Sequence, residues 1–152
     1  MDFTTDGTLY ICTRRGDVWA QKNGDWTRFA HGLHEPMGLL ARPDFVQVSQ
    51  RPEITKLVDE DGDGTAGRYE TISDQFAMEA NFHQYNYGLV KGSVPGTLHG
   101  ILSCSGLSKP DGSPVSANGF SPIPYRMWSY LITPSGEFWP WSSGLRTANG
   151  IG

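Results

Sequence analysis

The sequence lacks the features that mark several large classes of protein. It contains only two cysteines, Cys12 and Cys104, in 152 residues, which excludes a disulfide framework of the kind that holds small secreted domains together. Each cysteine lies inside an apolar, strand-like run, which favours a small buried side chain, although the sequence alone leaves a disulfide bond open. No Cys-x-x-Cys-His motif for haem attachment is present.

Long apolar runs and an excess of positive charge are missing as well. No stretch reaches the roughly 18 consecutive apolar residues of a transmembrane helix, so we expect no membrane span. The 12 basic and 16 acidic residues give a net charge of −4, which leaves no basic surface for nucleic acid. The first residues contain neither a basic segment nor an apolar one, so we expect no signal peptide in this sequence.

Turn-forming and aromatic residues are abundant instead. The chain has 19 glycines, 10 prolines and 12% aromatic residues, and they separate short apolar runs. This composition predicts an all-β fold, and 152 residues suffice for one domain with a sizeable core. Near the N-terminus, glycine-containing turns separate three expected strands, at residues 9–14, 17–21 and 26–29.

A short pattern recurs along the chain, because Gly38, Gly88 and Gly150 each open an apolar run. Repeats built on units of about four strands are typical of a β-propeller, and each glycine would open the innermost strand of a blade. We therefore expect one partial β-propeller domain over residues 1–152, with about three four-stranded antiparallel blades, half of a six-bladed ring. Its expected parts are a first-blade remnant at 1–33, a second blade at 34–82, a third at 83–144 and the start of another at 145–152.

The expected strands after the first blade follow from the same pattern. In the second blade they lie at residues 45–49, 53–58 and 68–72, after the strand that Gly38 opens. In the third they lie at 98–104, 129–133 and 137–141, after the strand that Gly88 opens. The stretch between Cys104 and Tyr125 is rich in Gly, Pro and Ser and is too long for a hairpin, so we expect an inserted loop there.

Three blades cannot close a ring, because propellers have roughly four to eight. One blade face and several strand edges would stay bare. Either the sequence is part of a longer protein, which we favour, or two copies assemble as a homodimer with six blades.

The stretch at residues 59–70 has the spacing of a calcium loop. Carboxylates occupy loop positions 1, 3 and 5, and Gly64 occupies position 6, where the chain must turn sharply. Position 7 offers a backbone carbonyl, and position 12 holds a glutamate able to bind a cation with both oxygens. The ligands this pattern predicts are Asp59, Asp61, Asp63, Thr65 and Glu70.

A solvated acidic turn is the alternative, because Asp-Gly pairs also favour turns without any metal. Position 9 is Gly67, so the side chain that usually holds a bridging water is missing. Three carboxylates this close repel one another without a cation, and this repulsion favours calcium.

Two family resemblances add to this interpretation. The segment 144–150, Gly-Leu-Arg-Thr-Ala-Asn-Gly, resembles the Gly-x-Arg-Asn-Pro-Gln-Gly element of the soluble glucose/sorbosone dehydrogenase propellers, which use pyrroloquinoline quinone. Segments 29–36 and 57–64 resemble bacterial exported propellers of the membrane-bound dehydrogenase type, often fused to cytochrome c modules. The second resemblance covers most of the chain, and the first covers a few short motifs.

Aligning Gly38, Gly88 and Gly150 places three polar residues four positions before a glycine; they are His34, Gln84 and Arg146. Corresponding connections of successive blades lie on one face near the axis, so these side chains should meet at a central mouth. Capping of loops by hydrogen bonds is the alternative role for His34 and His83.

The quinoprotein resemblance implies specific roles. His83 matches the histidine that removes the substrate's hydroxyl proton while hydride passes to the quinone, and its ordinary pKa suits that role. Arg146 matches the cofactor-contacting arginine, and Thr147 stands where the family has Asn. The alignment of the three glycines, rather than the resemblance, adds His34 and Gln84 to the expected cofactor site. The family's carboxylate partner for the histidine is absent, since residues 102–105 read Leu-Ser-Cys-Ser, and Glu79 is the alternative partner.

Two functions from different classes remain. One is a calcium-binding propeller that oxidises a sugar or alcohol hydroxyl, with cytochrome c as a candidate electron acceptor. The other is a non-catalytic exported propeller that binds glycan or protein. For both we expect a periplasmic or extracellular location, where calcium is plentiful enough to fill a weak loop.

Overall fold

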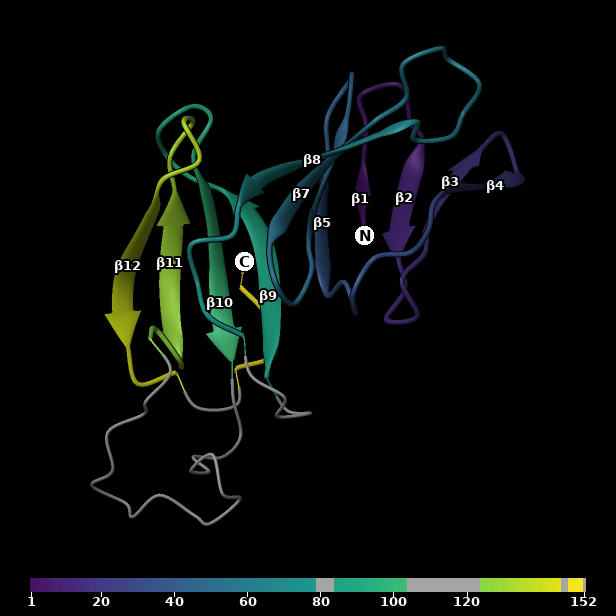
Figure 1. The fold of residues 1–152 in the computed structure, drawn as a ribbon. Helices are drawn as coiled ribbons and strands as arrows, with labels where there is room; N and C mark the ends of the chain where they lie inside the picture. The colour runs from purple at the N-terminus through teal and green to yellow at the C-terminus, as the bar shows by residue number, and fades with distance from the viewer. Residues whose placement is uncertain (79–83, 104–123, 146–147, 152) are drawn as a thin grey trace.

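The computed structural model describes residues 1–78, 84–103, 124–145 and 148–151. Over these residues the protein is all-β, with three four-stranded antiparallel sheets and no helix (Figure 1). The first sheet contains β1 (Asp2–Phe3), β2 (Leu9–Cys12), β3 (Val18–Lys22) and β4 (Asp25–Ala30). The second contains β5 (Gly38–Ala41), β6 (Val46–Ser49), β7 (Ile54–Val58) and β8 (Arg68–Ser73). The third contains β9 (Tyr85–Lys91), β10 (Leu98–Ser103), β11 (Trp128–Ile132) and β12 (Phe138–Ser143).

Each sheet is a meander in which strands adjacent in sequence are also adjacent in space. The β3–β4 hairpin shows why the local sequence suffices for this arrangement. Asn23 (φ 53°) and Gly24 (φ 96°) occupy the left-handed region. An Asn-Gly pair forms the tight turn whose twist matches that of the two flanking strands.

The second sheet lies between the other two, and its strands β5, β6 and β7 are largely buried on both faces, whereas β8 is more exposed. Successive side chains of a strand point to opposite faces, so Leu39 joins the core shared with the first sheet and Leu40 joins the core shared with the third. The first core contains Val18, Phe29, Ala30, Leu33, Leu39, Val46, Val48 and Leu57. The second contains Leu40, Ile54, Phe76, Leu89, Leu98, Leu102, Tyr130 and Ile132. Each fully buried aliphatic side chain contributes about 1.5–3 kcal/mol, so these two interfaces hold the stack together.

The repeated glycines lie next to one another in space. Met37 and Tyr87 form a parallel bridge between the starts of β5 and β9. A Cβ atom on Gly38 would fall 1.0 Å from the carbonyl oxygen of Gly88, so only glycine permits this approach. A Cβ on Gly88 would in turn lie 3.3 Å from Cγ2 of Ile151. The three repeats therefore follow one another across the stack, as their alignment in sequence predicts.

The structure confirms the all-β class and the four-stranded antiparallel units, and it corrects two details. The first sheet has four strands rather than three, because β1 was missed; two residues carry no periodic pattern. Gly88 lies inside β9 rather than opening it, since the strand begins at Tyr85. No described sheet closes on itself, so the propeller and its blade boundaries stay predictions. Among the described residues, none belongs to a helix that could cross a membrane.

Candidate functional site

The antiparallel order divides the connections between two ends of the stack. We call one the acidic end; it holds the β1–β2 turn, the β5–β6 turn and the β7–β8 loop at residues 59–67. The other, the arginine end, holds the β2–β3 turn, the β4–β5 connection and the β6–β7 turn. The acidic loop and His34 therefore lie at opposite ends of the stack.

At the acidic end, the structure brings together three of the predicted metal ligands. One carboxylate oxygen from each of Asp59, Asp61 and Asp63 lies within 4.8 Å of the others. The two oxygens of Asp59 accept hydrogen bonds from the backbone N–H groups of Gly62 (2.8 Å) and Gly64 (2.9 Å). The loop thus folds around this carboxylate.

Hydrogen bonds also keep Asp63 ionised. Its Oδ1 accepts the Thr65 hydroxyl at 2.5 Å and the Thr65 backbone N–H at 2.7 Å. These bonds stabilise the charged form and lower the pKa of Asp63. A deprotonated carboxylate is the form that binds a cation.

The loop is fastened to the neighbouring first sheet. The backbone N–H of Ala66 donates to the carbonyl of Phe29 at 2.7 Å. The Ala66 side chain packs against the first core. Gly64 faces Thr27, since a Cβ on this glycine would lie 4.0 Å from the Thr27 methyl. A hairpin of the second sheet is therefore positioned by the first.

Glu70, the predicted ligand at position 12, stands outside the group of three. After Gly67 the chain continues as strand β8, and Glu70 pairs there with Lys56 of β7, whose Nζ is 3.0 Å away. Arg68 forms a second ion pair with the same carboxylate. Strand geometry thus places Glu70 among the cations of its own sheet.

The donor set fits a hard cation. Carboxylate oxygens and a backbone carbonyl are the ligands that Ca²⁺ prefers, whereas the soft ligands that favour zinc or copper are absent from the loop sequence 59–70. Calcium takes six to eight oxygens. The three aspartates supply a part of that number.

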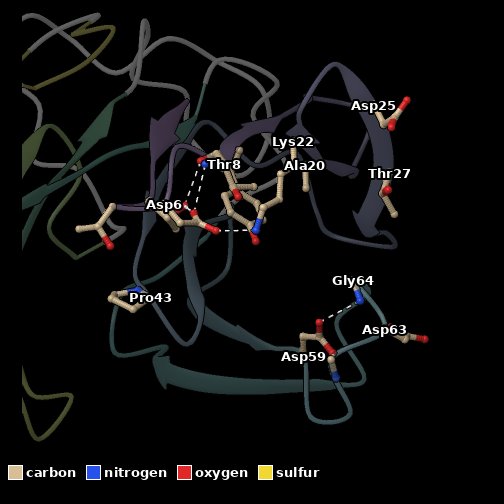
Figure 2. A pocket seen from close by; sticks show the side chains of 14 residues that line it. Asp6, Thr8, Ala20, Lys22, Asp25, Thr27, Pro43, Asp59, Asp63 and Gly64 are labelled. Atoms are coloured by element: carbon tan, nitrogen blue, oxygen red, sulfur yellow. Dashed lines mark hydrogen bonds and ion pairs between the residues drawn. The ribbon is translucent and has the colours of Figure 1, made fainter.

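A hollow of about 520 Å³ opens between this loop and the first sheet (Figure 2). Asp6 and Lys22 form its opposite wall, with Lys22 Nζ 2.6 Å from Asp6 Oδ2. Asp6 Oδ1 also accepts the Thr4 hydroxyl (2.5 Å) and the Thr8 backbone N–H (3.2 Å). The hydrogen bond from Lys22, followed by those from the threonines, lowers the pKa of Asp6. This wall is therefore an exposed ion pair.

Tyr10, on β2, is a third polar group of the hollow. Its ring packs edge-on against Phe29, with centroids 5.1 Å apart. Burial raises the pKa of Tyr10, and the negative charges of Asp6 and Asp59 add to the effect. The hydroxyl therefore stays protonated and is available as a donor.

At the arginine end, His34 is exposed and its loop is held through its backbone. Its N–H donates to Gln50 Oε1 at 2.6 Å, and its carbonyl accepts the Arg51 N–H at 3.0 Å. Gln84 is buried and donates to the Ala77 carbonyl at 3.0 Å. The remaining predicted mouth residues, His83, Arg146 and Thr147, lie outside the described residues.

A charged cluster that sequence analysis did not predict also lies at this end. Glu35 accepts from Arg14 Nε at 2.9 Å and from Arg51 Nη1 at 2.8 Å. Both guanidinium groups lie over the ring of Tyr85, at 4.9 and 5.7 Å from its centroid. Arg14 belongs to the β2–β3 turn of the first sheet, Arg51 to the β6–β7 turn of the second sheet, and Tyr85 to the third sheet. Because these segments are far apart in the sequence, no local pattern predicts the cluster.

Partial burial of Glu35 opposes its ionisation, but hydrogen bonds from Arg51 and Arg14 outweigh burial and lower its pKa. The backbone of Glu35 has φ of 46°, an uncommon value for a residue other than glycine. Two cations around one carboxylate leave the cluster with a net positive charge.

These contacts describe a loop with three grouped aspartates and a hollow beside it, and a cationic cluster at the opposite end. No protein-family model, no curated protein and no solved structure matches this chain.

Proposed function

We propose that this chain is a calcium-binding β-propeller module. The observation that carries the metal assignment is the approach of the Asp59, Asp61 and Asp63 carboxylates to within 4.8 Å of one another. A bound cation would offset their mutual repulsion. The face-to-face packing of three meander sheets and the stacking of the repeated glycines support the propeller arrangement.

Calcium should stabilise the protein, because a ligand that binds only the folded state adds RT ln(1 + [L]/Kd) to the free energy of unfolding. At a calcium concentration of roughly 100 times Kd, this addition is about 2.7 kcal/mol. We expect a matching rise in melting temperature, measured by calorimetry with calcium and with chelator.

The variant Asp61→Ala should abolish this rise, while Asp74→Asn, an exposed aspartate before β9, should keep it. If the unmodified protein has the same melting temperature with calcium and with chelator, the metal assignment is wrong.

For the chemistry of the arginine end, we propose oxidation of a sugar or alcohol hydroxyl by proton abstraction and hydride transfer. Pyrroloquinoline quinone, when bound, would accept the hydride, and a cytochrome c would be the electron acceptor. The resemblance assigns His83 as base and Arg146, with Thr147 beside it, to the cofactor. The alignment of the repeated glycines adds His34 and Gln84. The net positive charge of the cluster around Glu35 supports this proposal, because the quinone carries three carboxylates.

Addition of pyrroloquinoline quinone and calcium tests the redox proposal. We expect a shift in the quinone's absorbance, dye reduction on addition of aldoses, and loss of dye reduction in His83→Ala with the absorbance shift retained. Absence of quinone binding at concentrations of tens of micromolar would contradict the proposal that this chain is a quinone-dependent enzyme.

A non-catalytic module that binds glycan or protein is the second candidate. The absence of a carboxylate at residues 102–105 favours it, since His83 then lacks the family's orienting partner. Both candidates fit a periplasmic or extracellular location, and in both the remainder of a longer chain or a second copy would complete the ring.

A further inference from the structure

The hollow at the acidic end has the size and position of a binding site. Its volume of about 520 Å³ falls within the range of roughly 300–1,000 Å³ that is usual for small-molecule pockets. Its walls come from two sheets, with Lys22 of β3 on one side and Asp59 of the acidic loop on the other (Figure 2). The bond between Ala66 and Phe29 holds these walls in place.

The polar groups of the hollow include both donors and acceptors. Lys22 and the Tyr10 hydroxyl donate, the carboxylates accept, and four threonine hydroxyls do either. Four aspartates line it against one lysine, and a bound Ca²⁺ would still leave this lining negative, which disfavours an anionic ligand. Saccharide hydroxyl groups also donate and accept, and a neutral polyol therefore matches this lining.

The calcium loop adds a second reason. Position 9 is Gly67, without a side chain, and Glu70 at position 12 is paired with Lys56 and Arg68. A calcium ion held by the aspartates would thus keep coordination positions for oxygens from outside the protein. Asp59 and Asp63 belong both to the carboxylate group and to the lining of the hollow.

We propose that the hollow binds a saccharide or a similar neutral polyol, whose neighbouring hydroxyls complete the coordination of the loop calcium. The Asp6–Lys22 pair and Tyr10 hold the other side of the ligand. The site lies at the opposite end of the stack from the predicted mouth. The proposal rests on the calcium part of the proposed function and is independent of the quinone.

The test uses D-mannose, D-galactose, D-glucose and glycerol as probes, each measured by calorimetry and saturation-transfer NMR with calcium and with chelator. We expect at least one probe to bind with a Kd on the order of 1 mM, as suits a small neutral ligand. Chelator should weaken that binding at least about tenfold, because the metal supplies part of the contact.

Two variants separate the metal from the hollow. Asp61 is a candidate metal ligand that does not line the hollow, so Asp61→Asn should lose calcium and probe binding together. Tyr10→Phe keeps the packing on Phe29 and should leave the calcium affinity within about twofold, while weakening probe binding at least about fivefold. Tyr125→Phe makes the same chemical change in the turn before β11, outside the hollow, and should alter neither.

The outcomes distinguish the two proposals. Calcium binding without binding of any of the four probes would overturn the polyol site and leave the metal site standing. The polyol site would also be overturned if chelator does not weaken probe binding, or if Tyr10→Phe leaves probe binding unchanged. Absence of calcium binding would overturn both.

Discussion

At the scale of single residues, a buried hydrogen-bonded chain joins the second and third sheets. Tyr130 is completely buried, and its hydroxyl donates to Asn86 Oδ1 at 2.6 Å. Asn86, also buried, donates through Nδ2 to the carbonyl of Gln50 at 3.2 Å. Burial raises the pKa of Tyr130, so the hydroxyl stays a donor. Buried polar groups of this kind are stable only while each keeps its partner.

Tyr130→Phe should therefore destabilise the fold by about 1–3 kcal/mol, because it leaves the Asn86 oxygen buried without its donor. Urea unfolding followed by tryptophan fluorescence measures this change. Tyr125→Phe, at an exposed tyrosine, should shift the free energy of unfolding by no more than about 0.5 kcal/mol. Equal effects of the two variants would mean that the Tyr130–Asn86 bond contributes nothing.

At the scale of secondary-structure elements, close approach of backbones sets how neighbouring sheets meet. The contact between β5 and β9 depends on Gly38, whose missing Cβ leaves room for the Gly88 carbonyl. The Glu35 cluster makes a second link between elements, because it ties turns of two sheets to the start of β9. One link is steric and the other electrostatic, so they respond to different changes.

Gly38→Ala should lower stability by about 3 kcal/mol or more, since the added methyl would overlap a backbone atom and β5 would have to move away from β9. Gly150→Ala is the matched control, because a Cβ there meets nothing within 4 Å. Thermal unfolding of both variants measures the difference. A Gly38→Ala protein as stable as the control would show that β5 and β9 do not approach in this way.

The Glu35 link should depend on pH. Arg51 and Arg14 lower the pKa of Glu35 in the folded state, so its stabilising effect is complete above the unfolded pKa of about 4.3 and is lost as pH falls through the lower folded value. Glu35→Gln should cost on the order of 1 kcal/mol near pH 7 and progressively less in acid. Denaturant unfolding at several pH values measures this trend.

Glu137→Gln, in an exposed turn of the third sheet, is the control for this experiment and should show no comparable dependence on pH. A Glu35→Gln cost that stays constant from pH 7 into acid would contradict the role of the two arginines.

At the scale of the whole molecule, the two outer faces of the stack expose large apolar side chains. On the first sheet, Phe3 and Trp26 are 60% and 52% exposed. The strand pairing places both side chains on the face of this sheet that points away from the first core. On the third sheet, Trp139 and Trp141 are 57% and 67% exposed. Trp139 pairs with Leu131, whose two neighbours in the strand belong to the second core. Leu131 and Trp139 therefore lie on the opposite face of the third sheet, away from that core.

Exposed apolar surface of this extent favours association. We expect the isolated chain to self-associate as its concentration rises, and the double variant Trp139→Lys, Trp141→Lys to shift it toward the monomer. The change in the free energy of unfolding should stay within about 0.5 kcal/mol, because both side chains are exposed. Sedimentation velocity measures the association, and identical profiles for the two proteins would contradict a role for this face.

Features coded by neighbouring residues were predictable from the sequence. Alternating apolar residues and Asn-Gly or Asp-Gly turns are local signals, so the strands of the second sheet appear close to where residues 45–49, 53–58 and 68–72 were expected. The carboxylates of the acidic loop are likewise close in sequence, and the structure brings Asp59, Asp61 and Asp63 together. The two-residue strand β1 has no such signal, because only its pairing with β2 defines it.

The sequence by itself determined the all-β class, the antiparallel meanders and the grouping of the three aspartates, since turn chemistry and strand periodicity act over a few residues. Only the tertiary structure decided that Glu70 pairs with Lys56, that Glu35 meets two arginines, and that a hollow separates the acidic loop from the first sheet. Those contacts join different strands or sheets, and their positions depend on how β-strands pair and how the apolar faces pack against one another.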